Sequence, residues 1–395
     1  KLITCAAALD AGAVSKNSTF YCGESISVAG TRFHCANHKR HGSQTVTQAL
    51  ENSCNQSFIQ IGARLGKEAF CDYFAAFGLR KPTGVDLPAE PKKSLYYTAD
   101  RMGPVELASC AFGQSSKITP IQMITAFAAT INGGNLMKPY VVQSITDASG
   151  AVLQNTEPTL TRQVVSQESS DRARAILESV VSEGTGGNAY QAGYRIGGKT
   201  GSSETDEEGR TIVSFMGFAP ADDPQVIVLL AYDKPQEASP GSKYGTTGVY
   251  ISGGNMAAPQ AGKLIAQILD YMGVEKQYSQ EESAAVNVST PQAVGYSVAD
   301  AAARLEKKGL TYRTVGTGDV VTAQVPAAGA AVPGGSAVIL YLGGAQPEET
   351  GTMPNIVGLS YETAKKRLEE AGFFMHAVGT STFYSNTSKA ESQSV

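Results

Sequence analysis

The sequence predicts an α+β fold, and three observations lead to it. Helical patterns occupy much of the first 270 residues without the regular alternation of strand and helix that builds a parallel sheet. Three strand-like segments follow one another closely between residues 194 and 232, as in an antiparallel meander. A polar stretch then leads into a shorter region that contains an internal repeat.

Apolar periodicity and end signals locate the helices. Residues 1–13 are apolar and Ala-rich and form part of a buried helix. Residues 44–65 form a helical region that is interrupted at 53–55, and residues 255–272 form an amphipathic helix. A helix over 119–131 has the strongest start, because Thr119, Pro120 and Gln122 make a capping box with proline in the first turn.

The strands of the meander are predicted at 194–200, 211–219 and 225–232. An acidic turn at 204–209 and a Pro-bounded turn at 220–224 separate them. We therefore expect an antiparallel sheet combined with helices.

Length and charge limit the possible functions. A chain of 395 residues with 42% hydrophobic residues has room for two or three domains with buried cores. Its net charge of −4 and the lack of a long basic block argue against nucleic-acid binding. No run of 18 apolar residues is present. Because the first residue is Lys1, we interpret the chain as part of a longer protein whose anchor is not included.

The C-terminal third divides into small modules. Residues 276–290 are rich in Ser, Gln and Glu and are predicted to be a linker. The segment Val294–Ser297 recurs 63 residues later at Val357–Ser360, with matching positions in the helix that follows. We predict one module at 291–344, a linker at 345–351, and a second module at 352–395 that is cut before its last strands.

Three short motifs have the residue types of an acyl-transfer site. Lys199-Thr200-Gly201 is predicted to end a strand, Ser53-Cys54-Asn55 interrupts a helical region, and Lys1 begins an apolar helix. Each motif alone is weak, since a solvated lysine or a polar helix break would look the same. Their order and spacing resemble the S-x-x-K, S-x-N and K-T-G motifs of the penicillin-recognising serine transferases.

The rest of the chain narrows this resemblance to class B penicillin-binding proteins. Met353–Ser360 is similar to the opening of a PASTA module, which is found in such enzymes of Gram-positive bacteria. Phe215–Pro220 and the segment from Phe112 to Gln122 also resemble these enzymes, and Asn52–Asn55 looks most like their sporulation-type members.

The resemblance implies a role for each motif residue. Lys1 is the lysine of S-x-x-K, and the nucleophilic serine is expected three places before it, so the chain as given is expected to be inactive. Ser53 relays a proton, Asn55 holds the substrate amide, and Lys199 is a second cation beside Lys1. Further substrate contacts with the terminal carboxylate and in the oxyanion hole are expected from Thr200, Gly201 and Ser202.

The same resemblance implies a fold with an antiparallel sheet, helices on both sides of it and an all-helical region. It also implies ligands, partners and a cellular location. We expect peptidoglycan stem peptides and β-lactams as ligands, and a membrane glycosyltransferase as partner of a membrane-anchored enzyme outside the cytoplasm. A β-lactamase shares the motifs but lacks the PASTA tail. A non-enzymatic β-lactam or muropeptide sensor on the same fold remains an alternative.

The six cysteines all precede residue 111. Cys5, Cys71 and Cys110 lie in apolar helical patterns and are predicted to be buried free thiols. Cys35 and Cys54 are a possible redox pair, because Cys54 lies between Ser53 and Asn55, and Cys22 competes for Cys35.

The cysteines and histidines between positions 22 and 41 are a candidate zinc site. Their spacing matches no regular zinc framework, and basic residues intervene, so a solvated basic loop is favoured and neither a metal nor a cofactor is expected. The residues considered were Cys22, His34, Cys35, His38 and His41.

Overall fold

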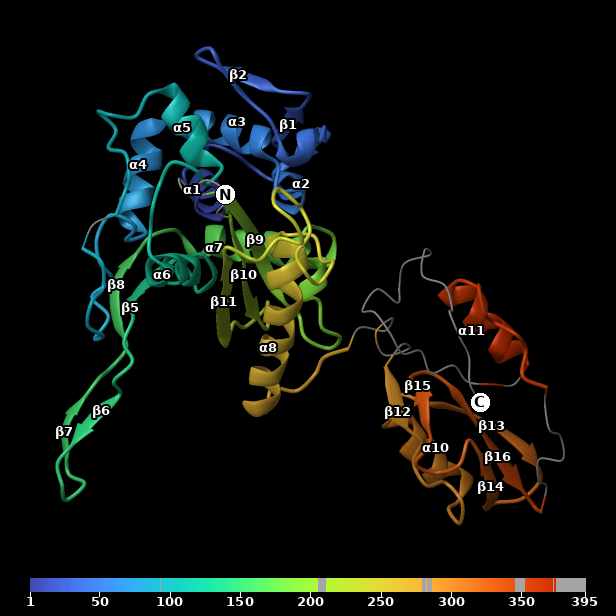
Figure 1. Ribbon diagram of the computed structural model, residues 1–395. Helices are drawn as coiled ribbons and strands as arrows, with labels where there is room; N and C mark the ends of the chain where they lie inside the picture. The colour runs from blue at the N-terminus through green and yellow to red at the C-terminus, as the bar shows by residue number, and fades with distance from the viewer. Residues whose placement is uncertain are drawn as a thin grey trace. The chain divides into compact units, whose positions relative to one another are not determined.

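The chain divides into two units, Lys1–Glu275 and Lys276–Val395, in the computed structural model shown in Figure 1. The structure describes residues 1–92, 94–204, 211–278, 282, 286–344, 352–371 and 373. Among these residues, the helices are all too short or too polar to cross a bilayer.

A three-stranded antiparallel sheet is the centre of the first unit. Its order is β11 (Val226–Asp233), β10 (Thr211–Ala219) and β9 (Gly197–Glu204), which confirms the predicted meander. The predicted acidic turn lies, beyond Glu204, outside the described residues.

The bounds predicted for the first strand were wrong. Lys199 does not end a strand but lies inside β9, paired with Met216 of β10. Gly197 and Gly198 precede Lys199 in this strand, and the packing there leaves no room for a side chain at either position. A Cβ at Gly197 would lie 2.4 Å from the Phe218 ring, and one at Gly198 would lie 2.4 Å from the Phe215 ring.

Helices cover both faces of this sheet (Figure 1). Met216 and Phe218 pack on one side into a core that includes residues of α1 (Leu2–Asp10) and α7 (Gln167–Ser182). Phe215 points to the other side, into a core formed largely by α8 (Ala258–Tyr271). Each buried phenylalanine contributes roughly 2 kcal/mol from the apolar area it removes from water.

The predicted helices are present. The region predicted at 44–65 is split as expected, into α2 (Val46–Glu51) and α3 (Asn55–Leu65), although its first two residues belong to a strand. The capping box of Thr119 and Gln122 starts α6 (Pro120–Ile131). The remaining helices of this unit are α4 (Lys67–Ala76), α5 (Pro104–Ala111) and the short turns η1 (Ala36–His38), η2 (Gly187–Ala189) and η3 (Gly253–Ala257).

Among the described residues of the first unit, eight short strands were not predicted. Each has three to five residues, which is too short for an alternating pattern to stand out. They pair as four antiparallel ribbons: β1 (Thr19–Cys22) with β4 (Gly42–Thr45), β2 (Ile26–Val28) with β3 (Thr31–Phe33), β5 (Asn135–Lys138) with β8 (Thr159–Gln163), and β6 (Ser144–Thr146) with β7 (Val152–Asn155).

The second unit has its own small core. Ala301 and Leu305 of α10 (Val298–Glu306) pack against β16 (Ala337–Leu342). The equivalent Ala364 and Leu368 of α11 (Tyr361–Glu370) are also buried. The linker predicted at 345–351 and most of 372–395 lie outside the described residues. The other strands are β12 (Asn287–Ser289), β13 (Thr311–Gly316), β14 (Val321–Val325) and β15 (Ala331–Pro333).

Candidate active site

Two of the three motifs meet directly. Lys199 lies on β9, and Ser53 lies in the turn between α2 and α3. The Lys199 Nζ donates to Ser53 Oγ at 3.0 Å, and it also contacts the carbonyl and hydroxyl oxygens of Thr200. Ser53 has a φ of +51°, in the left-handed region that few serines adopt. The turn is therefore held in a conformation that aims the hydroxyl at the strand.

The third motif lies beside the other two. Lys1 begins α1, and its Nζ donates to the carbonyl of Phe112 at 3.0 Å. The charge of Lys1 acts on Lys199, so both ammonium groups lie near each other in a partly buried region. The segment around Phe112, which sequence similarity had singled out, thus fixes the Lys1 side chain.

Burial moves both lysines toward neutrality. It lowers the pKa of the Lys1 side chain to about 8, while negative charge on Cys35 and Cys54 opposes the change. Burial, together with the positive charge of Lys1, lowers the pKa of Lys199 to about 7. A neutral amine that can accept a proton is therefore available near pH 7, as a base in this site requires.

Asn55 is held by the loop that precedes it. Its Nδ2 donates to the backbone carbonyl of His34 at 3.1 Å. The amide oxygen is left as the group that Asn55 presents to a ligand. Asn55 is the first residue of α3, so this hydrogen bond links the start of the helix to the loop before η1.

The far side of β9 is closed by the segment that leads into α8. The Ser202 hydroxyl accepts from the Gly253 backbone N–H at 3.1 Å, and the hydroxyls of Thr200 and Thr185 are 3.4 Å apart. A Cβ at Gly253 would lie 2.2 Å from the Ser214 carbonyl oxygen and 2.5 Å from that of Gly201. This glycine lets two backbones meet behind the K-T-G motif.

Comparison with known proteins decides the family. The penicillin binding protein transpeptidase domain matches residues 1–249, and the PASTA domain matches residues 288–344. The chain belongs to the penicillin-binding protein transpeptidases.

Relatives of this transpeptidase chain include a sporulation protein and a peptidoglycan D,D-transpeptidase homolog. Stage V sporulation protein D of Bacillus subtilis is 39% identical over 356 residues, which are 87% of this chain and 53% of that protein. The peptidoglycan D,D-transpeptidase FtsI homolog of Mesostigma viride is 30% identical over 266 residues, which cover 60% of this chain and 44% of that protein. The chain thus spans about half the length of these relatives.

Solved structures support the same fold for the transpeptidase chain. The D,D-transpeptidase domain of a peptidoglycan glycosyltransferase from Eggerthella lenta is 28% identical, with a TM-score of 0.59 over 69% of this chain and 64% of that one. Penicillin binding protein 3 of Mycobacterium tuberculosis in complex with aztreonam is 25% identical, with a TM-score of 0.62 over 70% and 62%.

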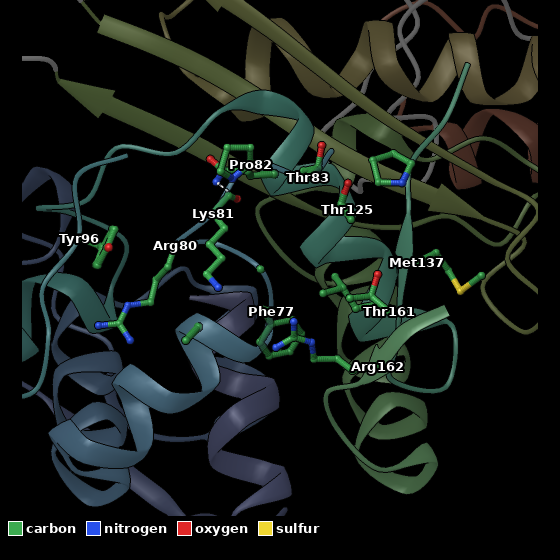
Figure 2. A pocket seen from close by; sticks show the side chains of 15 residues that line it. Phe77, Arg80, Lys81, Pro82, Thr83, Tyr96, Thr125, Met137, Thr161 and Arg162 are labelled. Atoms are coloured by element: carbon green, nitrogen blue, oxygen red, sulfur yellow. Dashed lines mark hydrogen bonds between the residues drawn. The ribbon is translucent and has the colours of Figure 1, made fainter. Parts of the chain in front are cut away.

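A cavity elsewhere in the transpeptidase unit lies apart from the motifs. It has a volume of about 410 Å³ and lies between the end of α4, α6 and the β5–β8 ribbon. Figure 2 shows Arg80, Lys81 and Arg162 among its lining side chains, and none of the motif residues lines it. This cavity and the motif residues therefore occupy different parts of the unit, and the candidate active site is the one defined by the hydrogen bonds between motifs.

Three buried sulfurs and one imidazole meet beneath the turn of Ser53. We call this group the Cys3His cluster. Neighbouring ligand atoms are 3.3–3.6 Å apart, and all four lie within 4.8 Å of one another. The cysteines are nearly inaccessible and the histidine is half-buried. Its members are Cys22, Cys35, His41 and Cys54.

This cluster differs from the set that the sequence suggested. His34 and His38 stack on each other with ring centroids 4.6 Å apart, and neither belongs to the cluster. Cys54 does belong, and it lies 13 residues after His41. Because Cys54 lies between Ser53 and Asn55, the sequence suggested a redox role at the active site for it and not a role as a metal ligand. Cys5, Cys71 and Cys110 are buried and free, as predicted.

Proposed function

We propose that this chain is the catalytic part of a peptidoglycan D,D-transpeptidase that cross-links stem peptides and is acylated by β-lactams. The contact between Lys199 and Ser53, in a partly buried region shared with Lys1, carries the proposal. It unites the three motifs that this chemistry needs, from residues far apart in sequence.

In the proposed mechanism, a serine three residues before Lys1 attacks the substrate carbonyl. Lys1 accepts the serine proton, since burial leaves part of its side chain neutral. The protonated form of Lys199, about half of the population at pH 7, supplies the second cation, and the Ser53 hydroxyl carries the proton toward the leaving amine. An amine from a second stem peptide then releases the acyl group.

Substrate contacts are assigned to the outer end of β9 and to Asn55. Asn55 receives the substrate amide through its side-chain oxygen. Thr200 and Ser202 hold the terminal carboxylate with Lys199, and Gly201 leaves room for the substrate backbone between them. The backbone N–H of Ser202 forms half of the oxyanion hole, a group whose loss typically costs 10²–10³ in rate.

We further propose that the full-length protein is anchored in the membrane, acts outside the cytoplasm, and works beside a membrane glycosyltransferase. The second unit carries a PASTA module and, by the repeat in the sequence, a second copy from 352 onward. Muropeptide binding, docking on the catalytic unit and spacing are the three roles considered for it.

The test compares residues 1–395 with a chain extended upstream to include the serine. Only the extended chain is expected to form a covalent adduct with fluorescent penicillin and to turn over a thioester substrate. Adduct formation without thioester turnover would support the sensor alternative. Labelling of residues 1–395 at Ser53 would contradict the assigned mechanism.

A further inference from the structure

We propose that the Cys3His cluster binds one zinc ion and that the metal holds the turn of Ser53 and Asn55 in its working position. Zinc binding stands on the cluster geometry alone. The positioning role rests on the proposed transpeptidase function.

The distances in the cluster fit a tetrahedral metal site. With zinc about 2.3 Å from sulfur and about 2.0 Å from nitrogen, the edges of a tetrahedron are about 3.8 Å between sulfurs and about 3.5 Å between sulfur and nitrogen. The Cys22 and Cys35 sulfurs are 3.6 Å apart, those of Cys35 and Cys54 are 3.5 Å apart, and His41 Nδ1 is 3.3 Å from Cys22. These separations leave the cluster close to the size that zinc requires.

Separate pieces of secondary structure bring the ligands together. Cys22 ends β1 and is opposite Gly42 of β4 in the ribbon, so His41 lies next to it across the strands. Cys54 is the N-cap of α3, and Cys35 precedes η1. Because the fold itself fixes these positions, zinc binding needs little rearrangement of the chain.

The donor types select zinc over other common ions. Three thiolates and one imidazole form a closed tetrahedral set of the kind that structural zinc sites use, whereas magnesium and calcium prefer oxygen ligands. The Cys54 sulfur also accepts from the Ser57 backbone N–H at 3.4 Å, at the start of the eleven-residue α3. Such a donor favours the thiolate that a metal needs.

Two links connect the cluster to the catalytic residues. Cys54 is joined covalently to Ser53 and Asn55, and Cys35 follows His34, whose carbonyl holds the Asn55 amide at 3.1 Å. Zinc would fix both links at once. Ser53 has a left-handed backbone conformation, which the surrounding structure must hold in place.

Zinc binding and a Cys35–Cys54 disulfide exclude one another, since both use the same two sulfurs. In the oxidation, these two sulfurs give two electrons to a small disulfide such as oxidised glutathione. This occurs in the zinc-free protein: one S–S bond forms between the cysteines, the S–S bond of the oxidant breaks, and the two cysteine protons pass to the two glutathione sulfurs. The metal therefore protects the pair that sequence analysis marked as a possible redox switch.

The test measures metal content, which does not depend on activity. The chain is purified under reducing conditions without a polyhistidine tag, and zinc is quantified by elemental analysis. About one zinc per chain is expected. Replacement by Co²⁺ should give the intense visible bands of a tetrahedral site and a thiolate-to-cobalt band in the near ultraviolet.

Matched variants separate ligation from a general effect on the loop. His41→Asn should weaken zinc binding at least about 100-fold, and His41→Cys should retain it, because a four-thiolate site is also tetrahedral. His38→Asn changes a histidine of the same loop that lies outside the cluster, and it should retain full zinc content. A chelator should lower the Tm of the parent chain and of His38→Asn alike.

Two outcomes would overturn the proposal. One is a parent chain that takes up neither zinc nor Co²⁺ after full reduction. The other is equal zinc content in the parent, His41→Asn and His38→Asn, all three folded by circular dichroism. If zinc binds as expected but the loss of zinc leaves the acylation rate of the extended chain unchanged, the positioning role fails while the transpeptidase assignment stands.

Discussion

Lys199 donates a hydrogen bond to the hydroxyl of Ser53 across 3.0 Å, although 146 positions separate them in the sequence. One residue lies inside a strand of the central sheet, and the other lies in a left-handed turn between two helices. The contact therefore depends on how the sheet and the helical region pack together, and it is sensitive to changes on either side.

Replacing Lys199 by alanine should slow acylation far more than it lowers stability. The change removes the partner of Ser53 and a cation beside Lys1, so we expect the acylation rate constant of the extended chain to fall by at least about 100-fold. The Tm should change by no more than about 4 °C. Stopped-flow or gel measurements with fluorescent penicillin give the rate. Lys263→Ala, on the exposed face of α8, is the control. A lower Tm with an unchanged rate would show that Lys199 is only structural.

The pH dependence of acylation should reflect a buried amine. Because burial lowers the pKa of Lys1 to about 8 and that of Lys199 to about 7, the rate should rise with pH and level off near these values. A solvated lysine would instead give a rise that continues past pH 10. The measurement is the acylation rate constant from pH 5.5 to 9.5, and an apparent pKa above 9.5 would contradict the proposed base.

Stability should show the same shift with a defined sign. The pKa of Lys199 is about 7 in the folded chain and 10.5 when unperturbed, so between these values the unfolded state binds more protons. Stability then rises with pH across this window. We expect Lys199→Met to gain stability over the parent, with the gain largest at pH 7 and below and lost as pH approaches 10.5. Denaturant melts at several pH values measure the difference, and a gain that grows with pH would refute the assignment.

Gly253→Ala should damage the site through the backbone behind β9. A Cβ there would lie 2.2 Å from the Ser214 carbonyl oxygen of β10 and 2.5 Å from the Gly201 carbonyl oxygen of β9, which forces one of these strands or η3 to move. Such overpacking costs about 1–3 kcal/mol, and the displaced K-T-G motif should acylate more slowly. Gly187→Ala is the matched control, since the nearest atom to its Cβ would be at 3.7 Å. Equal stability of the two variants would show that the close approach is not needed.

The sequence predicted the helices and the meander because long apolar patterns and caps are local signals. Thr119 and Gln122 marked the start of α6 without any knowledge of its neighbours. The bounds of β9 were wrong for the opposite reason, since the strand was predicted at 194–200 and lies at Gly197–Glu204. Gly197 and Gly198 have no local preference for a strand, and the rings of Phe218 and Phe215 across the sheet explain why glycine is needed there.

The site divides in the same way. Lys1, Ser53 and Lys199 could be proposed as site residues because the order and spacing of their motifs are visible in the sequence. The Cys3His cluster was not found, since β1, β4 and the start of α3 must first fold before Cys54 approaches Cys22 and His41. The set considered from the sequence held Cys22, Cys35 and His41 but lacked Cys54. It also included His34 and His38, which stack on each other outside the cluster.

Removing residues 290–395 should leave the catalytic unit folded. Each apolar core described in the structure lies within one unit, so the deletion takes none of the residues that stabilise the sheet and its helices. We expect a single cooperative melt with a Tm within about 3 °C of that of the longer chain. Insolubility, or a broad melt at low temperature, would show that the second unit stabilises the first.

Oxidation should inactivate the extended enzyme only after its zinc has been removed. The sulfurs of Cys35 and Cys54 are 3.5 Å apart and need to move toward about 2.05 Å to bond, which pulls on the turn of Ser53. In the entropic model, a disulfide that closes this loop raises the free energy of the unfolded chain by about 3 kcal/mol. This effect favours the disulfide-bonded folded chain once the metal is gone. Oxidised glutathione should therefore slow acylation of the zinc-free protein at least about tenfold, with recovery on adding a thiol reductant. The zinc-loaded protein and zinc-free Cys35→Ser should show no such loss. Mass spectrometry of the oxidised protein identifies the bond. If the rates are equal with and without the reductant and no Cys35–Cys54 peptide is found, the pair is not a switch.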